Sequence, residues 1–240
     1  MSSASAIQSI MTRAPVIPVL AIDEVEVAVD LARALVDGGL PVLEVTLRTD
    51  AALAAVEAIA EALPQATVGV GTVISAGQVA SAQSAGARFV VSPGFTASVA
   101  VRAQQLDLPL LPGVMTPSEV MAAVEAGLDH LKFFPATAAG GVDMLKALAG
   151  PFPQARFCPT GGITADNHLS FLRLANVLCV GGSWLAPADA VAARDWPRIR
   201  ALAAAVSGQR SPSAEAGGVG DRWYSVAGEE DPGSAFEDLR

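Results

Sequence analysis

The sequence predicts an α/β fold, a (β/α)8 TIM barrel made by a single domain, with a short N-terminal helix before the first strand. Three observations support this prediction. Short apolar runs recur at intervals of about twenty residues, and stretches with helical periodicity lie between them. Eight such runs are present, the number that a closed barrel of parallel strands requires. Glycine and proline stand where the helices should end and begin.

The expected elements follow one another along the chain. Strands are expected at residues 16–21, 41–47, 67–73, 88–92, 109–114, 130–134, 156–159 and 177–181, and the clearest helices at 24–37, 50–63, 117–126 and 141–149. Gly86 and Gly127 are placed to end helices, and Thr116 and Glu119 form a capping-box pattern around a proline. The residues before the first strand should form a short helix that plugs or flanks the barrel. A doubly wound sheet is the alternative, but no G-x-G-x-x-G motif opens a helix after the first strand.

The composition is that of a globular protein, with 52% hydrophobic and 16% charged residues in a chain of 240. A net charge of -9 and the lack of a basic run argue against a nucleic-acid partner, and an acidic surface repels anionic membranes. The N-terminus lacks the pattern of a secretory signal, and the uncharged segment 62–87 contains proline and glycines that argue against a membrane span. We therefore expect a cytoplasmic protein in which Cys158 and Cys179 are buried free thiols.

The last segment of the chain, 207–240, differs from the rest. It contains seven acidic residues against three arginines and has neither helical nor strand periodicity. We predict that residues 1–206 form the barrel and that residues 207–240 are a mobile, disordered acidic tail.

Lys132 is one of only two lysines and stands in an apolar strand between Leu131 and Phe133. Arginine stays protonated, whereas a desolvated lysine can lose its proton and become a nucleophile toward a carbonyl carbon. The alternative is a lysine at a strand end that extends its ammonium group to water. The position of Lys132 indicates imine chemistry.

Polar residues also alternate along the second predicted strand. Glu44, Thr46 and Arg48 share one face, and Leu43 and Val45 share the other. Because the apolar residues should pack against helices, the polar ones should point into the barrel. A buried carboxylate there must be paired or functional. A Glu44–Arg48 ion pair that only orders the strand is the structural alternative.

The ends of the third and fourth strands supply further candidates, since barrel active sites form at the C-terminal ends of the strands. Gly69 and Gly71 would let a ligand or backbone approach closely, and Thr72 supplies a hydroxyl at the rim. Pro93 follows the fourth strand in a turn that can equally serve only to end the strand.

The seventh and eighth strands each lead into a Gly-Gly turn. These turns are Gly161-Gly162 and Gly181-Gly182, and Ser183 adds a hydroxyl donor after the second. Barrels commonly bind phosphate in the loops after these two strands, where backbone N–H groups converge. The pair of turns predicts a phosphate site.

Metal and hydrolase sites receive little support. The chain has only two histidines, His130 and His168, and they are not spaced as metal ligands. We expect His130 to be packed or hydrogen-bonded inside the barrel and His168 to face solvent. No G-x-S-x-G elbow of a serine hydrolase is present.

Several of these segments together resemble one family, the 2-dehydro-3-deoxy-6-phosphogluconate and 4-hydroxy-2-oxoglutarate aldolases. The likeness extends from about residue 15 to residue 206 and rests on motifs in the family's order: Glu44-x-Thr46-x-Arg48, Gly69-Val-Gly-Thr72, Ser92-Pro-Gly94, Lys132-Phe-Phe-Pro135, Pro159-Thr-Gly-Gly162 and Gly181-Gly-Ser-Trp184. The resemblance implies a class I aldolase of the Entner–Doudoroff pathway that needs no metal or cofactor. It also implies a (β/α)8 barrel, a homotrimer and a small-molecule substrate. The acidic tail is not part of the family core.

The resemblance also implies a role for each matching residue. Lys132 would form the Schiff base, and Glu44 would act as general acid and base. The pyruvate end of the substrate would be held by Arg48, Thr72, Pro93 and Phe134. The phosphate end would be held by Thr160, Gly161, Gly162, Gly181, Gly182 and Ser183. A hydroxyl at Thr160 resembles the members that act on the gluconate epimer.

Three other functions stay open. The nearest is the same reaction on the galactonate epimer. The second is a phosphosugar isomerase or epimerase in which Glu44 is the proton-abstracting base and Lys132 only a charge. The third is a phosphate-ligand binder in which Glu44 and Lys132 form a structural pair.

Overall fold

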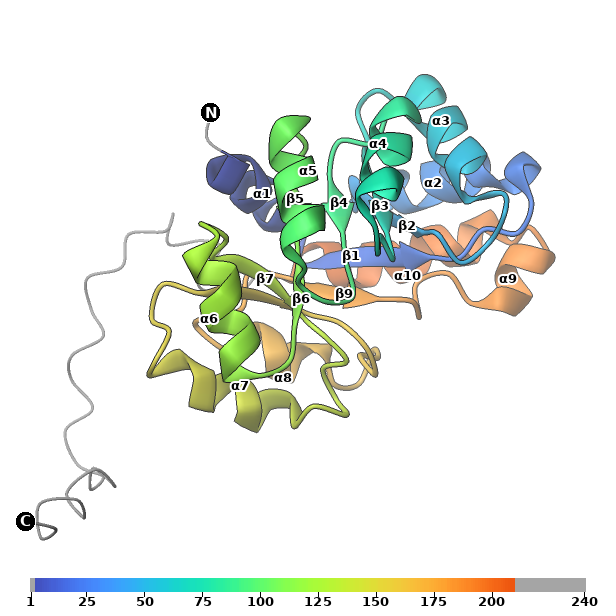
Figure 1. Ribbon diagram of the computed structural model, residues 1–240. Helices are drawn as coiled ribbons and strands as arrows, with labels where there is room; N and C mark the ends of the chain where they lie inside the picture. Colours follow the sequence, from blue (N-terminus) through green and yellow to red (C-terminus); the bar gives the residue numbers. More distant parts are fainter. Residues whose placement is uncertain (1–2, 210–240) are drawn as a thin grey trace, which may run out of the picture.

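The computed structural model describes residues 3–209 and has the predicted α/β architecture with parallel strands (Figure 1). The strands in this part of the chain are β1 (Val16–Leu20), β2 (Val42–Thr46), β3 (Thr67–Gly71), β4 (Val90–Val91), β5 (Leu110–Leu111), β6 (Gly113–Val114), β7 (His130–Phe133), β8 (Arg156–Pro159) and β9 (Val180–Gly182). The helices are α1 (Ser3–Thr12), the 3-10 helix η1 (Val25–Val27), α2 (Ala28–Asp37), α3 (Ala52–Ala62), α4 (Ala76–Ser84), α5 (Ala97–Gln105), α6 (Pro117–Glu125), α7 (Gly141–Ala149), α8 (His168–Leu172), α9 (Ala188–Ala192) and α10 (Trp196–Ser207).

The strands form two parallel sheets. One has the order β5-β4-β3-β2-β1-β9 and the other the order β6-β7-β8. The fifth strand was expected to run unbroken over 109–114, which is wrong: Pro112 separates β5 from β6, because proline has no N–H to donate to a ladder. The last strand begins at Val180, later than predicted. The six-stranded sheet is a parallel half-barrel, and closure into eight strands stays a prediction.

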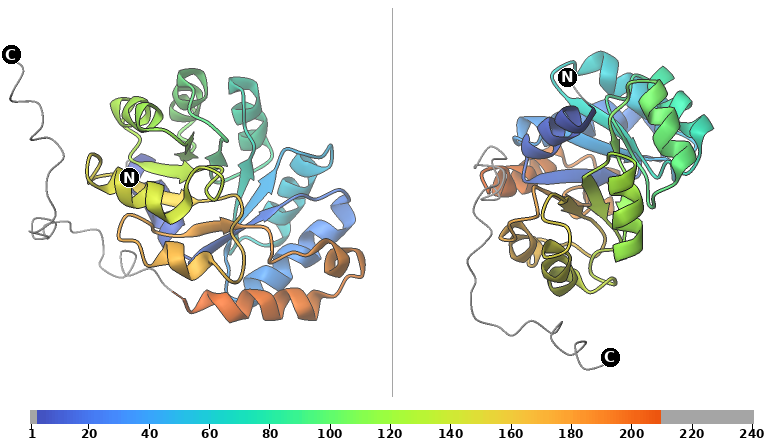
Figure 2. Two further views of the ribbon diagram at one scale, coloured as in Figure 1. Left: turned by 90° about the horizontal axis from the view of Figure 1, so that it is seen from below. Right: turned by 60° about the vertical axis from the view of Figure 1, so that its left-hand side comes forward.

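The strands present different faces to two apolar layers. Leu43 and Val45 of β2 belong to the layer between strands and helices, and Val42 belongs to a separate inner cluster with Ile17 and Phe89. This alternation follows from the two-residue period of a strand. In the two views of Figure 2 the helices lie outside the strands.

Helix α1 confirms the helix expected before the first strand. Its residues Ile7, Ile10 and Met11 are buried and belong to the inner cluster. The helix contacts β5 and β7. It therefore covers the inner apolar layer at one end of the strands.

The predicted helix signals are confirmed where the structure describes them. Thr116 and Glu119 make both hydrogen bonds of a capping box at the start of α6. Gly86 and Gly127 follow α4 and α6 with φ angles of 82° and 79°, a left-handed conformation that glycine adopts without steric cost. The predicted helix at 24–37 begins as the 3-10 turn η1 and becomes α-helical at Ala28.

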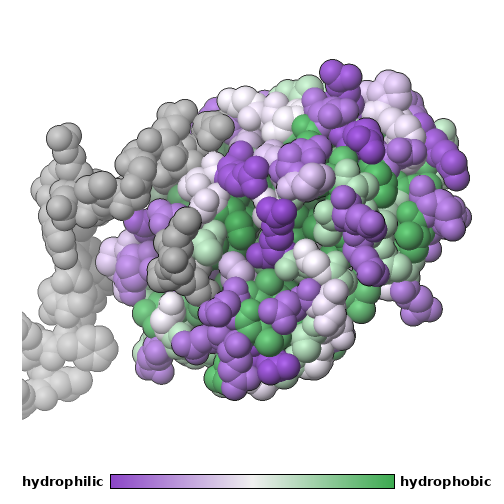
Figure 3. Space-filling model, turned by 90° about the horizontal axis from the view of Figure 1, so that it is seen from above, coloured by the Kyte–Doolittle hydropathy of each residue, from purple (hydrophilic) through white to green (hydrophobic). Residues whose placement is uncertain are grey.

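The surface is mixed in character. Seen from above, over α3 to α5, hydrophilic residues alternate with smaller hydrophobic areas (Figure 3). Among the described residues, none of the helices has the length and apolar character needed to cross a membrane. Of the predicted acidic tail, residues 210–240 lie outside the described part of the chain.

Candidate active site

The centre of the site is a contact between Lys132 on β7 and Glu44 on β2. The Lys132 Nζ atom donates a hydrogen bond to Glu44 Oε1 at 3.1 Å, across 88 positions of sequence. The two residues are 6% and 3% exposed, so both are largely removed from water. The ring of Phe134 lies beside the amine, with its centroid 5.3 Å from Nζ. An amine and a carboxylate held together in an apolar site can exchange protons with a bound molecule.

Two structural alternatives from the sequence are wrong. Lys132 does not extend its ammonium group to water, because its side chain is 7% exposed. Within residues 3–209, the salt bridge of Glu44 is made with Lys132 and not with Arg48. Glu44 was predicted to point inward from its strand, and its burial and its contact with Lys132 confirm this direction.

The position of Glu44 depends on its neighbours in the sheet. A Cβ atom at Gly71 on the adjacent strand would lie 2.1 Å from Glu44 Oε1, so only glycine leaves room for the carboxylate. Gly69 likewise makes room for the ring of Phe89. These glycines therefore accommodate protein side chains, and the close approach of a ligand or backbone to them stays a prediction. The Thr46 hydroxyl donates to the Leu20 carbonyl at 2.8 Å and joins β2 to β1 at the rim.

A cavity of about 660 Å³ opens at the C-terminal ends of β1, β2, β8 and β9. The predicted site residues that line it are Arg48, Phe134, Thr160, Gly161, Gly162, Gly181, Gly182 and Ser183. Lys132 and Glu44 are outside its lining but adjoin it, since Phe134 contacts Lys132 and Thr46 lies on the same face of β2 as Glu44. The cavity thus joins an exposed arginine to two glycine turns, past the buried amine.

Thr72 and Pro93 follow β3 and β4 and do not line this cavity. Thr72 has a φ angle of 62°, a strained backbone conformation for a β-branched residue. Residues with such strain cluster at functional sites. The Pro93 carbonyl packs against Gly113, whose strand partner is Lys132. Beside Pro93, the Ser92 hydroxyl is buried and has no hydrogen-bond partner within the described residues. Sequence reasoning treated Ser92 as part of a turn.

The two Gly-Gly turns lie next to each other, as predicted. Thr160 and Gly181 form an isolated parallel bridge between the ends of β8 and β9. Gly161 and Gly162 have φ angles of 100° and 75°, which explains the need for glycine in this turn. Gly181 leaves room for the Thr160 side chain, since a Cβ there would lie 2.3 Å from Thr160 Oγ1. Backbone N–H groups in such turns suit an anionic group.

Sequence reasoning missed the residues that support these turns. Thr137 donates from both its N–H and its hydroxyl to the Gly161 carbonyl, at 3.0 and 3.1 Å. Asn167 donates its side-chain amide to the Gly162 carbonyl at 2.9 Å. The ring of Trp184 packs directly on Gly182. The only sequence signal was the closeness of Asn167 and Trp184 to the glycines that they contact; Thr137 lies 24 positions from Gly161.

The two histidines behave differently from each other. His130 is 7% exposed, and its Nδ1 atom is 2.7 Å from Asp129 Oδ1, which confirms the expected packed and hydrogen-bonded residue. His168 was expected to face solvent, which is wrong: it is 3% exposed because its ring packs against Trp184. Among residues 3–209, no three His, Cys, Asp or Glu side chains are grouped as metal ligands.

Cys158 and Cys179 are buried free thiols, as predicted. The hydrogen bond with the Cys158 side chain, together with complete burial, raises the pKa of the Cys179 thiol well above its ordinary value. Cys158 lies two residues before Thr160, and its sulfur is 3.9 Å from the Thr160 hydroxyl. Cys158 and Cys179 both belong to the inner apolar cluster.

Comparison with known proteins identifies the family. The family model "KDPG and KHG aldolase" matches residues 7–202. The KHG/KDPG aldolase of Escherichia coli K12 is 52% identical over 196 residues, which are 82% of this chain and 92% of that protein.

Two solved structures have the same fold at high identity. The KDPG aldolase of Legionella pneumophila, with pyruvate captured at low pH as a covalent carbinolamine intermediate, has a TM-score of 0.82 at 48% identity and covers 83% of this chain and 97% of its own. The 2-keto-3-deoxy-6-phosphogluconate aldolase of Zymomonas mobilis ZM4, with 3-phosphoglycerate, has a TM-score of 0.84 at 46% identity and covers 88% and 99%. The family model and these relatives span the whole of the described site, and this chain belongs to the KDPG and KHG aldolase family.

Proposed function

We propose that the protein is a class I aldolase that cleaves 2-dehydro-3-deoxy-6-phosphogluconate to pyruvate and glyceraldehyde 3-phosphate. The observation that carries this proposal is the buried contact of 3.1 Å between Lys132 Nζ and Glu44 Oε1, beside a cavity with an arginine and two glycine turns. 4-Hydroxy-2-oxoglutarate, which would give pyruvate and glyoxylate, is a second substrate of the same chemistry.

The first step is attack of the Lys132 amine on the C2 ketone of the substrate. This gives a carbinolamine, which loses water to become a protonated imine. The burial of Lys132 and its carboxylate partner support this role, because Glu44 can accept the proton that the amine must lose. The relative from Legionella pneumophila holds pyruvate as a covalent carbinolamine.

The second step breaks the C3–C4 bond. Its electrons move to the imine nitrogen and leave an enamine, while Glu44 removes the proton of the C4 hydroxyl and glyceraldehyde 3-phosphate departs. Glu44 then returns a proton to C3, and water hydrolyses the imine to release pyruvate and the free Lys132 amine. Every group in these steps belongs to the chain, the substrate or water, so the proposal needs no metal or cofactor.

The remaining site residues hold the two ends of the substrate. We assign the carboxylate and the pyruvate carbons to Arg48, Thr72, Pro93 and Phe134, and the phosphate to Thr160, Gly161, Gly162, Gly181, Gly182 and Ser183. Arg48 and the glycine turns lining one cavity support this assignment. The structure of the relative from Zymomonas mobilis contains the phosphorylated acid 3-phosphoglycerate, which supports a ligand with a phosphate and a carboxylate.

The assembly and its location are part of the same proposal. We infer that the two sheets form one (β/α)8 barrel in residues 1–206, because bridges join the β8 and β9 segments and only Pro112 divides β5 from β6. A cytoplasmic homotrimer is proposed from the family resemblance.

The test is a continuous assay of pyruvate release with the gluconate substrate and its C4 epimer. We expect faster cleavage of the gluconate form, in keeping with the hydroxyl of Thr160. Lys132→Arg should lower the rate at least about 10³-fold, because a guanidinium forms no imine. Lys146→Arg is the matched control, since the Lys146 side chain is 64% exposed, and it should leave the rate unchanged. Pyruvate release by Lys132→Arg at the wild-type rate would contradict the imine mechanism. Failure of the wild-type chain to release pyruvate would favour the isomerase or binder functions.

A further inference from the structure

The two glycine turns proposed to hold phosphate are both supported from the start of helix α8. The first is held by Asn167, which precedes the helix. Its side-chain Nδ2 donates to the Gly162 carbonyl at 2.9 Å, and its Oδ1 accepts from the Thr164 N–H at 2.9 Å. Both ends of this amide are used, so the carbonyl of Gly162 is fixed relative to the loop that follows β8.

The second turn is reached through His168 and Trp184. The His168 ring centroid is 5.6 Å from that of Trp184, with an angle of 40° between the planes. The Trp184 ring in turn packs so closely on Gly182 that a Cβ there would lie 1.7 Å from a ring carbon. Trp184 therefore contacts both the histidine and the turn, and it cannot shift toward Gly182.

His168 is itself held at both ring nitrogens. Nδ1 is 2.8 Å from the Ala165 carbonyl, and Nε2 is 2.6 Å from Gln209 Oε1. Gln209 also donates to the Ala205 carbonyl of α10 at 3.0 Å. The ring is thus fastened to the last turn of α10, 41 positions away in sequence.

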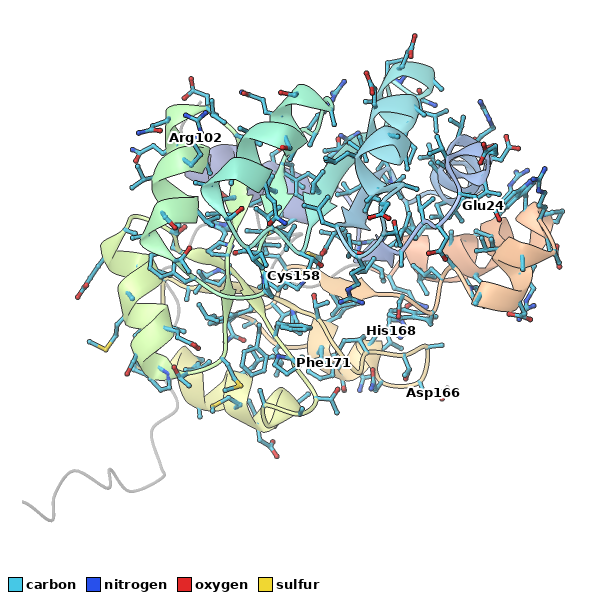
Figure 4. The ribbon with its side chains drawn as sticks, turned by 45° about the vertical axis from the view of Figure 1, so that its right-hand side comes forward. Glu24, Arg102, Cys158, Asp166, His168 and Phe171 are labelled. Atoms are coloured by element: carbon cyan, nitrogen blue, oxygen red, sulfur yellow. The ribbon has the colours of Figure 1, made fainter. Side chains whose placement is uncertain are left out.

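Figure 4 shows the orientation of these residues. His168 is turned toward the interior of the molecule, whereas Asp166, two positions earlier, lies at the outer edge. The burial of His168 agrees, since only 3% of the residue is exposed. Burial of a polar ring costs free energy unless the ring is hydrogen-bonded, and both nitrogens of His168 have partners.

We propose that Asn167 and His168 are positioning residues for the phosphate site, Asn167 for the turn at Gly162 and His168, through Trp184, for the turn at Gly182. This inference rests on the proposed function. The two turns are joined by the bridge between Thr160 and Gly181, so their spacing depends on both supports. Neither support touches the reacting amine and carboxylate. Loss of a support should therefore weaken binding of the phosphate and leave the chemical step intact.

The experiment compares two substrates that differ at the phosphate end. Asn167→Ala and His168→Ala should each raise KM for 2-dehydro-3-deoxy-6-phosphogluconate about five- to tenfold, the effect of losing one or two contacts. The values of kcat, and of kcat/KM for the unphosphorylated 4-hydroxy-2-oxoglutarate, should stay within about twofold of wild type. Leu169→Ala, a 40% exposed neighbour on the same helix, is the matched control and should change neither substrate.

A variant that fails to fold does not end the test. Gln209→Ala removes only the link between His168 and α10, at the end of the described chain. Like His168→Ala, it should raise KM for the phosphorylated substrate. Unchanged KM in Asn167→Ala and Gln209→Ala would overturn the inference. An equal loss on both substrates would also overturn it, because it would indicate a general structural role.

A binding measurement separates this inference from the proposed function. If the wild-type chain releases no pyruvate from either substrate, the aldolase proposal fails. Titration with sn-glycerol 3-phosphate, followed by calorimetry, then decides the inference without catalysis. Weaker binding by Asn167→Ala and His168→Ala, with Leu169→Ala like wild type, would support it. Equal binding by all variants, or no binding by wild type, would overturn it.

Discussion

The substitution Gly71→Ala tests whether the exact position of Glu44 matters for the reaction. Gly71 lies on β3 beside Glu44 on β2, and the two strands pair in parallel. A Cβ atom at position 71 would lie 2.1 Å from Oε1, 2.6 Å from Cγ and 2.7 Å from Cδ of Glu44. Since Gly71 does not have a positive φ angle, alanine strains the packing and not the backbone.

The size of the effect follows from these distances. An ordinary van der Waals contact begins at 3.4 Å, so the carboxylate of Glu44 must move by about 1.3 Å if the strands stay in place. Its hydrogen bond to Lys132 is already 3.1 Å long and would be lost in most directions of movement. A displacement of about 1 Å in a catalytic group can cost about 10²-fold in rate. Overpacking should also lower the free energy of unfolding by about 1–3 kcal/mol.

The assay measures kcat for pyruvate release and thermal unfolding on the same samples. Gly71→Ala should stay folded and lose about 10²-fold in kcat. Gly77→Ala is the matched control, because a Cβ at this helical position has no neighbour closer than 3.9 Å. It should keep full activity and gain at most about 0.4–1 kcal/mol in stability, since alanine favours helix more than glycine does. Full activity in folded Gly71→Ala would refute the role assigned to the position of Glu44.

Two further predictions concern titratable groups away from the reacting atoms. Partial burial raises the pKa of Glu119, but hydrogen bonds from two backbone N–H groups and from Thr116 outweigh it, so the pKa lies below its ordinary value of 4.5. The ionised Glu119 carboxylate therefore stabilises the fold above pH 4.5 and loses this effect as the pH falls through the lowered pKa. Glu119→Gln should reduce the free energy of unfolding, measured in urea at pH 7, by at most about 0.5 kcal/mol. The difference in this free energy between the variant and wild type should disappear in acid. Cys158 and Cys179 should react with a thiol reagent at pH 8 only after unfolding, because both are buried and the pKa of Cys179 is raised; labelling of the folded chain within minutes would contradict this.

Much of the site could be predicted because each strand alternates its side chains. The two-residue period placed Glu44 on the inner face of β2, and the lone Lys132 in an apolar strand marked the other partner. Their contact could then be expected from the parallel arrangement of strands, and the structure has it at 3.1 Å. The helix signals were predictable for a similar local reason, since capping residues act within one turn.

The parts that could not be predicted depend on contacts between distant segments. His168 lies on the helix after the strand that ends at Pro159 and was expected to face solvent. It is buried because Trp184 and Gln209, from the segments that follow β9 and α10, contact it. Similarly, Gly71 was expected to let a ligand or backbone approach closely, and only the packed structure shows that its missing side chain makes room for Glu44. Such pairings are set by tertiary structure, which sequence periodicity does not describe.

The central claim is that Lys132 forms an imine with the substrate carbonyl. The measurement is peptide mass spectrometry after the chain has been incubated with pyruvate and sodium borohydride, which reduces an imine to a stable amine. The chain has two lysines, and Lys146 is exposed, so the modified site can be read directly. We predict a reduced pyruvyl group on Lys132, absent from Lys132→Arg and retained in Lys146→Arg. No adduct on the folded wild-type chain, or an adduct on Lys146 alone, would contradict the account.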